Sequence, residues 1–78
     1  MQHRLTRNTM DKLIEIAKRA ISVNKDLLAE EEKFVEALSE HRDIKDLKEK
    51  SDKISLLIRK EVLYQQVATK VLEKTINP

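Results

Sequence analysis

The apolar residues of the first half of the chain come in adjacent pairs that recur every seven residues. The pairs are Leu13-Ile14, Ala20-Ile21, Leu27-Leu28 and Phe34-Val35, with Met10, Ala17 and Leu38 three or four positions from their neighbours. Because an α-helix makes one turn about every 3.6 residues, this spacing keeps the apolar side chains on one side of a helix. The pattern predicts a helix over about residues 9–39, with Asn8 as the residue that caps its start.

The same spacing returns in the second half after a polar stretch. Between residues 39 and 53 only Ile44 and Leu47 are apolar, and the apolar series then resumes three or four residues apart. The series consists of Ile54, Leu57, Ile58, Val62, Tyr64, Ala68, Val71 and Leu72. It predicts a second helix over about residues 44–75.

The position of the turn follows from the residues that can cap a helix. Asp43 followed by Asp46 is typical of a capping residue with an acidic first turn, so we place the turn at Glu40 to Asp43. A turn at Lys50 to Asp52 is the alternative, because Ser51 and Asp52 are also capping residues. The sequence contains no glycine and no internal proline that would mark the turn.

Two long helices joined by a short turn predict an all-α antiparallel two-helix hairpin. If the chain reverses near His41, facing residues have numbers that sum to about 82, which brings most apolar residues opposite apolar ones. The bulky Tyr64 then lies opposite the small Ala17. A three-helix bundle with a break near residues 24–27 and a single continuous rod are the alternatives that this pattern leaves open.

A hairpin of this size has little core of its own. We expect one helical domain over residues 1–78, with a flexible basic arm at residues 1–8 and the hairpin at residues 9–75. Small scaffolds without disulfides or metals are often stabilised by oligomerisation, so we expect coiled-coil-like dimerisation into a four-helix bundle. The candidate interface consists of apolar residues beside the main stripes: Ile16, Val23, Leu56, Leu63 and Val67. The alternative is that they form the outer edge of one broad core face.

Three polar residues interrupt the apolar stripes: Asn24, Glu31 and, in the second half, Glu61. A polar residue buried between helices can fix their register and the oligomeric state. At the edge of a stripe, the same residue simply reaches water. The sequence leaves both interpretations open.

Charge is unevenly distributed, although 16 basic and 14 acidic residues give a net charge of only +2. Residues 1–25 carry +4, residues 26–40 carry −5 and residues 41–60 carry +3. A chain that folds back on itself would pair the acidic block with the basic block after it, with Glu32 opposite Lys50. Acidic residues four apart near the carboxyl end of a helix are unfavourable, because they repel each other and the helix dipole opposes them. A candidate surface for a basic partner is therefore formed by Glu32, Glu36 and Glu40.

The residue types needed for catalysis and for metal or cofactor binding are scarce. Without glycine there is no phosphate-binding loop, and without cysteine there is no thiolate site or disulfide. His3 and His41 are the only histidines, and neither lies at metal-ligand spacing from another ligand. We therefore predict no catalytic residues, no metal and no cofactor, and a protein that is not an enzyme.

These observations predict a protein–protein interaction module, a small self-associating helical adaptor, chaperone, inhibitor or assembly subunit. Its partners are expected to be itself and an unidentified protein, without a membrane. The chain has no long apolar segment and no cysteine, so a cytoplasmic location is expected. The alternative is a small nucleic-acid-binding regulator that uses basic residues of the arm and the first helix: Arg4, Arg7, Lys18 and Arg19.

Overall fold

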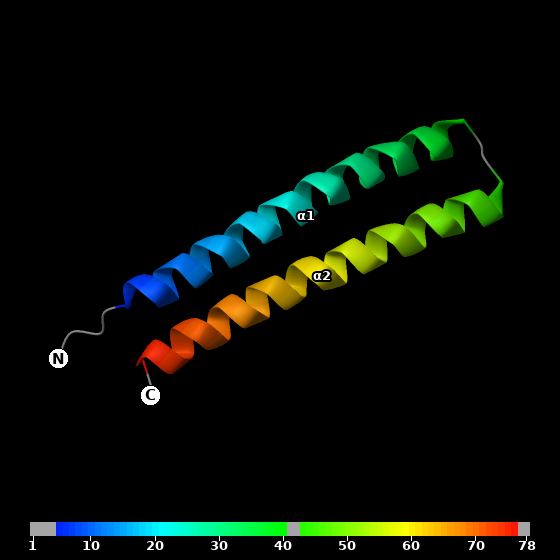
Figure 1. Cartoon of the computed structure of the whole chain (residues 1–78). Coiled ribbons are helices and arrows are strands. Elements are labelled where there is room, and N and C mark those ends of the chain that lie inside the picture. Colours follow the sequence, from blue (N-terminus) through cyan, green and yellow to red (C-terminus); the bar gives the residue numbers. More distant parts are fainter. Residues whose placement is uncertain (1–4, 41–42, 77–78) are drawn as a thin grey trace.

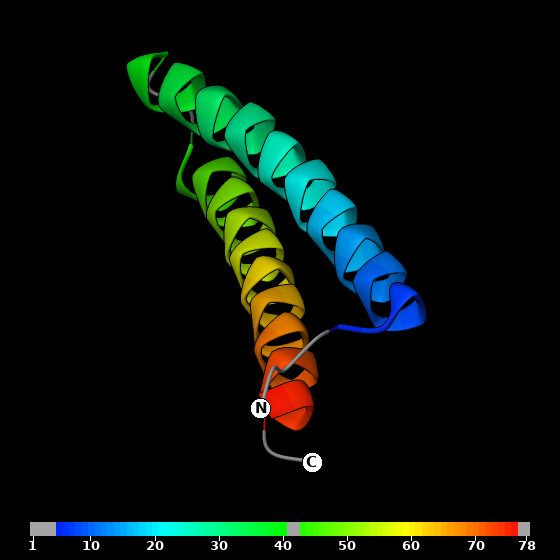
Figure 2. The same ribbon diagram turned by 90° about the vertical axis from the view of Figure 1, so that its left-hand side faces the viewer.

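The computed structural model describes residues 5–40 and 43–76, and they form a helical hairpin (Figure 1). Helix α1 comprises Arg7–Ser39 and helix α2 comprises Ile44–Ile76, each of 33 residues. The two helices run side by side in opposite directions, as a second view confirms (Figure 2). The predicted hairpin is therefore confirmed. The three-helix alternative is wrong, because α1 continues without a break through residues 24–27.

Helix α1 begins two residues earlier than the sequence pattern predicts. The hydroxyl of Thr6 accepts a hydrogen bond from the backbone N–H of Thr9 at 3.1 Å, which makes Thr6 the N-cap. The predicted cap, Asn8, lies inside the first turn. Thr is also among the residues that favour the N-cap position. The earlier start adds the backbone hydrogen bond from Met10 N–H to the Thr6 carbonyl at 2.9 Å. Residues 1–4 of the predicted arm lie outside the described residues.

The predicted turn is confirmed by the helix bounds. Asp43 caps α2, since its carboxylate oxygen Oδ1 accepts from the backbone N–H of Asp46 at 2.8 Å. On the other side of the turn, the N–H of Glu40 donates to the carbonyl of Glu36 at 3.0 Å. The alternative turn at residues 50–52 is wrong, because these residues lie within α2. Residues 41 and 42 lie outside the described residues.

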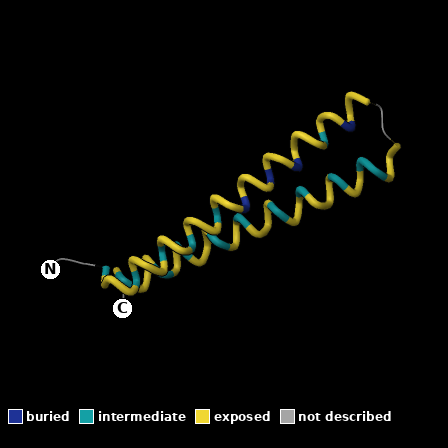
Figure 3. Tube along the Cα trace, turned by 45° about the horizontal axis from the view of Figure 1, so that its top comes forward, coloured by how far each residue is buried: buried dark blue, intermediate teal, exposed yellow. Residues whose placement is uncertain are grey.

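The two helices meet along side chains that alternate three and four residues apart, the spacing of a coiled coil. Apart from Asp46, these are the buried and half-buried residues of α1 and α2, and Figure 3 shows them on the sides that face each other. We call them the seam: Thr9, Leu13, Ile16, Ala20, Val23, Leu27, Glu30, Phe34 and Ala37 of α1, and Leu47, Lys50, Ile54, Leu57, Glu61, Tyr64, Ala68, Val71 and Thr75 of α2.

The register differs slightly from the predicted one. Seam residues of α1 and α2 match one to one when their numbers sum to 84, rather than about 82. The ion pair between Glu30 and Lys53, whose numbers sum to 83, supports this alignment because Lys53 directly precedes the seam residue Ile54. Tyr64 consequently lies level with Ala20 instead of the predicted Ala17. Both are alanines, so a large side chain still meets a small one.

Candidate functional site

The hairpin has two broad faces on opposite sides of the seam. In an antiparallel helix pair, residues that directly follow seam positions lie on one side of both helices, and residues that directly precede them lie on the other. Each set has 18 positions, nine on each helix. Twelve of the 18 preceding positions carry a charged residue, but only two of the 18 following positions do, Glu31 and Lys48. One face is therefore apolar and the other charged.

The apolar face is formed by ten large aliphatic side chains that directly follow seam residues. Their exposed fractions range from 42 to 61%. We call this set the apolar face: Met10, Ile14, Ile21, Leu28, Val35 and Leu38 of α1, and Ile58, Val62, Leu72 and Ile76 of α2. The seven-residue pattern predicts core positions for most of these residues, because an adjacent apolar pair does not show which member points at the partner helix.

The five candidate interface residues are divided by the structure. Val23 is only 5% exposed and lies in the seam, which favours the alternative of a core position over that of an interface with another chain. It takes a core position because the seam repeats in phase with Ile16 and Val23 rather than with Ile14 and Ile21. Ile16 is half-buried in the seam, while Leu56, Leu63 and Val67 are exposed beside it on the charged face.

Three of these residues, Ile16, Leu63 and Val67, come together in a groove on the charged face. The groove has a volume of about 410 Å³ and also includes Tyr64 and Val71 of α2. We call it the charged-face groove. Its polar rim on α1 is formed by Lys12, Glu15 and Arg19.

Arg19 is held at the rim of this groove by its neighbour one turn earlier. Its Nε donates to Glu15 Oε1 at 3.1 Å, and this hydrogen bond together with the carboxylate charge raises the pKa of Arg19. Tyr64 contributes in the same direction, which places the phenol near the guanidinium. Arg19 is thus oriented across the seam, and its charge is largely balanced by Glu15.

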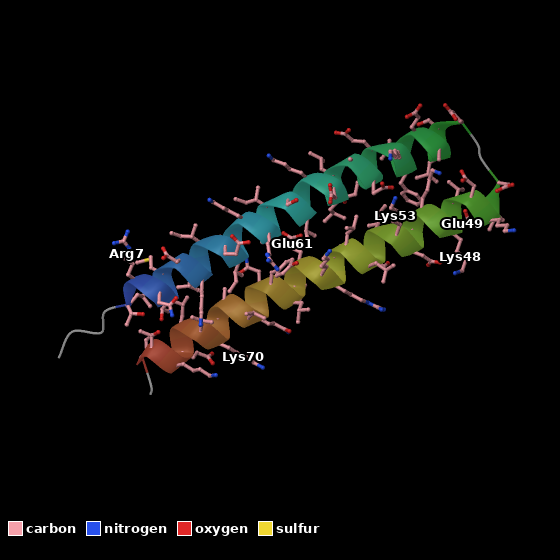
Figure 4. All side chains as sticks on the ribbon, in the orientation of Figure 1. Arg7, Lys48, Glu49, Lys53, Glu61 and Lys70 are labelled. Carbon is pink, nitrogen blue, oxygen red and sulfur yellow. The ribbon has the colours of Figure 1, made fainter. Side chains whose placement is uncertain are left out.

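Glu30 is a charged residue inside the seam that the sequence analysis missed. It is 9% exposed, and its Oε1 accepts from Lys53 Nζ at 3.1 Å and from Lys33 Nζ at 3.3 Å. Figure 4 shows Lys53 extending from α2 toward α1. The hydrogen bond from Lys53 lowers the pKa of Glu30 against the opposing effect of burial, and Lys33 adds to the lowering. The sequence feature that points to Glu30 as a seam residue is its spacing, because it lies three residues after Leu27.

The acidic and basic blocks do meet, but not through the predicted pair. Glu32 does not lie opposite Lys50, because Lys50 is in the seam and its Nζ pairs with Asp46 Oδ1 within α2 at 3.0 Å. Among the described residues, the ion pair that joins the two helices is Glu30–Lys53. Two residues of the candidate acidic surface, Glu36 and Glu40, border a hollow that Lys33 and Lys50 share, whereas Glu32 is exposed outside it.

The candidate nucleic-acid contacts are not gathered into one basic surface. Arg4 lies outside the described residues, and Arg7 and Lys18 are exposed on α1. Lys18 and Arg19 are adjacent, so their side chains point about 100° apart around the helix. Arg19 is in addition paired with Glu15.

The polar interruptions have different surroundings. Asn24 and Glu31 are exposed on the side of the apolar face, so within one hairpin they reach water. Glu61 is half-buried in the seam of α2 (Figure 4). The register places it level with Val23. Over residues 5–40 and 43–76, no group of three His, Cys, Asp or Glu side chains is placed to hold a metal ion. Nor does this part of the chain contain a helix long and apolar enough to cross a membrane.

No protein family, curated protein or solved structure matches the chain, so the function of these surfaces has to be inferred from their own chemistry.

Proposed function

We propose that this protein is a non-enzymatic protein–protein interaction module that self-associates through the apolar face. The observation that carries the proposal is the row of ten exposed aliphatic side chains along one face, with two charged residues among its 18 positions. Large contiguous apolar patches on small proteins mark surfaces that another molecule covers. An adaptor, chaperone, inhibitor or assembly subunit would use such a surface.

The size of the face suits a second copy of the hairpin. The Cα atoms of the hairpin extend over 60 × 17 × 15 Å, so one flat side offers on the order of 1,000 Å². Stable protein interfaces bury about 800 Å² on each partner. A second hairpin has the same length and the same apolar face, so each copy can cover the other completely.

Packing two hairpins face to face produces an antiparallel four-helix bundle. In a two-fold symmetric dimer the same residues contribute from both copies, which requires a self-complementary surface. The mostly uncharged apolar face meets this requirement, because no like charges accumulate across it apart from Glu31 and Lys48. Asn24 on this face is the residue that we expect to restrict the register of the two copies, as polar residues in helical interfaces do.

The proposal is tested by measuring the mass of the particle in solution by light scattering at micromolar concentration. We expect twice the chain mass of 9.1 kDa. The double substitution Ile21→Gln and Leu28→Gln should shift the particle to the mass of one chain. These residues are 56 and 57% exposed in the hairpin. A stable, fully helical monomer of the unmodified protein at 100 µM would contradict self-association.

The matched control changes two equally exposed residues on the opposite face. Leu56→Gln and Leu63→Gln remove side chains that are 64 and 55% exposed, with the same loss of apolar surface. This variant should keep the mass of two chains. If it dissociates as readily as the first variant, self-association does not depend on the apolar face.

A further inference from the structure

The charged-face groove lies on the side of the hairpin that the proposed dimer leaves open. Leu63, Val67 and the α1 rim residues directly precede seam positions, whereas the apolar face directly follows them. Covering the apolar face with a second copy would therefore leave one groove accessible on each hairpin. An interaction at the groove does not depend on the dimer, and the dimer does not depend on the groove.

The floor of the groove has the spacing of a helix-binding site. Leu63, Val67 and Val71 follow each other one turn apart along α2, and Ile16 contributes from α1. Leu56 is two turns before Leu63 on the same side and is also exposed. From Leu56 to Val71 these side chains span about 22 Å, at about 1.5 Å for each residue, with Lys60 between Leu56 and Leu63. An amphipathic helix of four turns has this length and presents apolar residues at the same intervals.

The charges around the groove are mostly positive. Lys12 lies on its α1 rim. Lys60 and Lys74 directly precede seam residues of α2 and so lie on the same face. Lys70 instead borders a hollow with Gln66 and Glu73 and extends from α2 away from α1 in Figure 4. In the described part of the chain Lys12, Lys60 and Lys74 have no ion-pair partner, whereas Glu15 is already paired with Arg19. The lysine charges remain available to a bound molecule.

We propose that the charged-face groove binds an acidic amphipathic helix of another protein. Aliphatic side chains of that helix pack on Leu63 and Val67, and its carboxylates lie beside Lys12 and Lys60. The apolar floor favours a helix over a fully hydrophilic polyanion, and the unpaired lysines select an acidic helix over a basic one.

The test uses two fluorescent 18-residue peptides with the same leucine positions, one with glutamate and one with lysine at the remaining positions. We expect the acidic peptide to bind the protein at least tenfold more tightly than the basic one, measured by fluorescence anisotropy. The double substitution Leu63→Gln and Val67→Gln should weaken binding of the acidic peptide at least tenfold. Replacing Lys12 and Lys60 by Gln should weaken it at least threefold and reduce its dependence on salt.

The matched control is the apolar-face variant with Ile21→Gln and Leu28→Gln. It should bind the acidic peptide within twofold of the unmodified protein even when it is monomeric, which separates this inference from the proposed self-association. Equal binding of both peptides would overturn the proposal. So would displacement of the peptide by a 20-base-pair DNA duplex whose own binding requires the lysines but not Leu63 and Val67, since that result assigns the surface to nucleic acid.

Discussion

The apolar face and the charged face flank the same seam over the same length, yet they differ in composition almost completely. The seam residue Ala20 lies between Arg19 on the charged face and Ile21 on the apolar face. In the same way, Leu27 lies between Asp26 and Leu28. On the charged face, water hydrates the lysines and carboxylates, and among the described residues the exposed large apolar side chains are confined to Leu56, Leu63 and Val67. The apolar face has ten exposed aliphatic side chains and two charged residues, and the proposed self-association rests on this difference.

The seam contains only a small hydrophobic core. Among the described residues, Val23, Leu27 and Ala37 are the buried apolar residues, and one further buried position is the charged Glu30. Two helices that share so small a core gain little from packing against each other. A second layer on the apolar face would bury the residues next to this core and so stabilise both helices.

The largest effect that we predict compares two neighbouring leucines. Leu27 is 8% exposed and Leu28 is 57% exposed. Leu27→Ala should reduce the free energy of unfolding by about 2–3 kcal/mol, as for other buried leucines. Leu28→Ala should cost about 0.5 kcal/mol or less in dilute solution, where the hairpin is alone, and more than about 1 kcal/mol at concentrations where the apolar face is covered.

Urea denaturation at several protein concentrations measures both changes. A cost for Leu28→Ala that stays small at every concentration would show that nothing covers the apolar face. A cost for Leu27→Ala that is equally small would show that the seam does not hold the hairpin together.

The second prediction concerns the acidic charge on the apolar face. Glu31→Leu replaces an exposed carboxylate by an aliphatic side chain in line with Leu28 and Val35, and it should strengthen self-association about tenfold. Glu32→Leu is the control, because residue 32 is neither a seam position nor directly beside one. Sedimentation equilibrium should find the control within twofold of the unmodified protein. A larger effect of Glu32→Leu than of Glu31→Leu would contradict the assignment of the faces.

The third prediction is a dependence of stability on pH that originates in the seam. The pKa of Glu30 is lowered from the ordinary value of 4.5, mainly by the hydrogen bond from Lys53. A carboxylate whose pKa is lower in the folded state stabilises the fold above its unfolded pKa, and this contribution is lost as the pH falls through the folded value. The thermal midpoint should therefore fall on acidification below about pH 4.5.

In Glu30→Gln this part of the pH dependence should disappear, whereas Glu31→Gln, which changes the adjacent exposed carboxylate, should retain it. Thermal unfolding followed by circular dichroism between pH 3 and pH 7 compares the two variants. Identical profiles for both would show that the Glu30–Lys53 pair does not stabilise the hairpin.

The two helices and their turn were predictable because long-range periodicity and capping chemistry are properties of the chain itself. Asp43 caps α2 as expected, since an aspartate followed three residues later by a second one is typical of a helix start. The choice between Leu27 and Leu28 was not predictable in the same way. Both are leucines, and rotating a helix by about 100° exchanges them, so only the partner helix decides which one is buried.

The same ambiguity explains the errors in the candidate site. A seam that includes Val23 also includes Glu30, seven residues later. An apolar pattern does not predict a glutamate at such a position. The structure accepts Glu30 because Lys53 and Lys33 reach it from the charged face with long side chains. The charged-face groove was likewise hidden, although Leu63 and Val67 were recognised as surplus apolar residues. Their proximity to Lys12 and Arg19 depends on the register of the two helices.

The smallest predicted effect concerns the basic charge at the edge of the apolar face. Lys48 pairs with Asp52 at 2.9 Å, but both side chains are mostly exposed. Such surface ion pairs contribute about 0–1 kcal/mol, so Lys48→Ala should change the free energy of unfolding by about 0.5 kcal/mol or less. Because Lys48 directly follows a seam residue near the turn, Lys48→Leu extends the apolar face and should strengthen self-association. Lys45→Leu, on the outer side of α2, should not, and light scattering across a dilution series distinguishes the two. Equal strengthening by both would mean that any added leucine promotes association and that the apolar face has no special part in it.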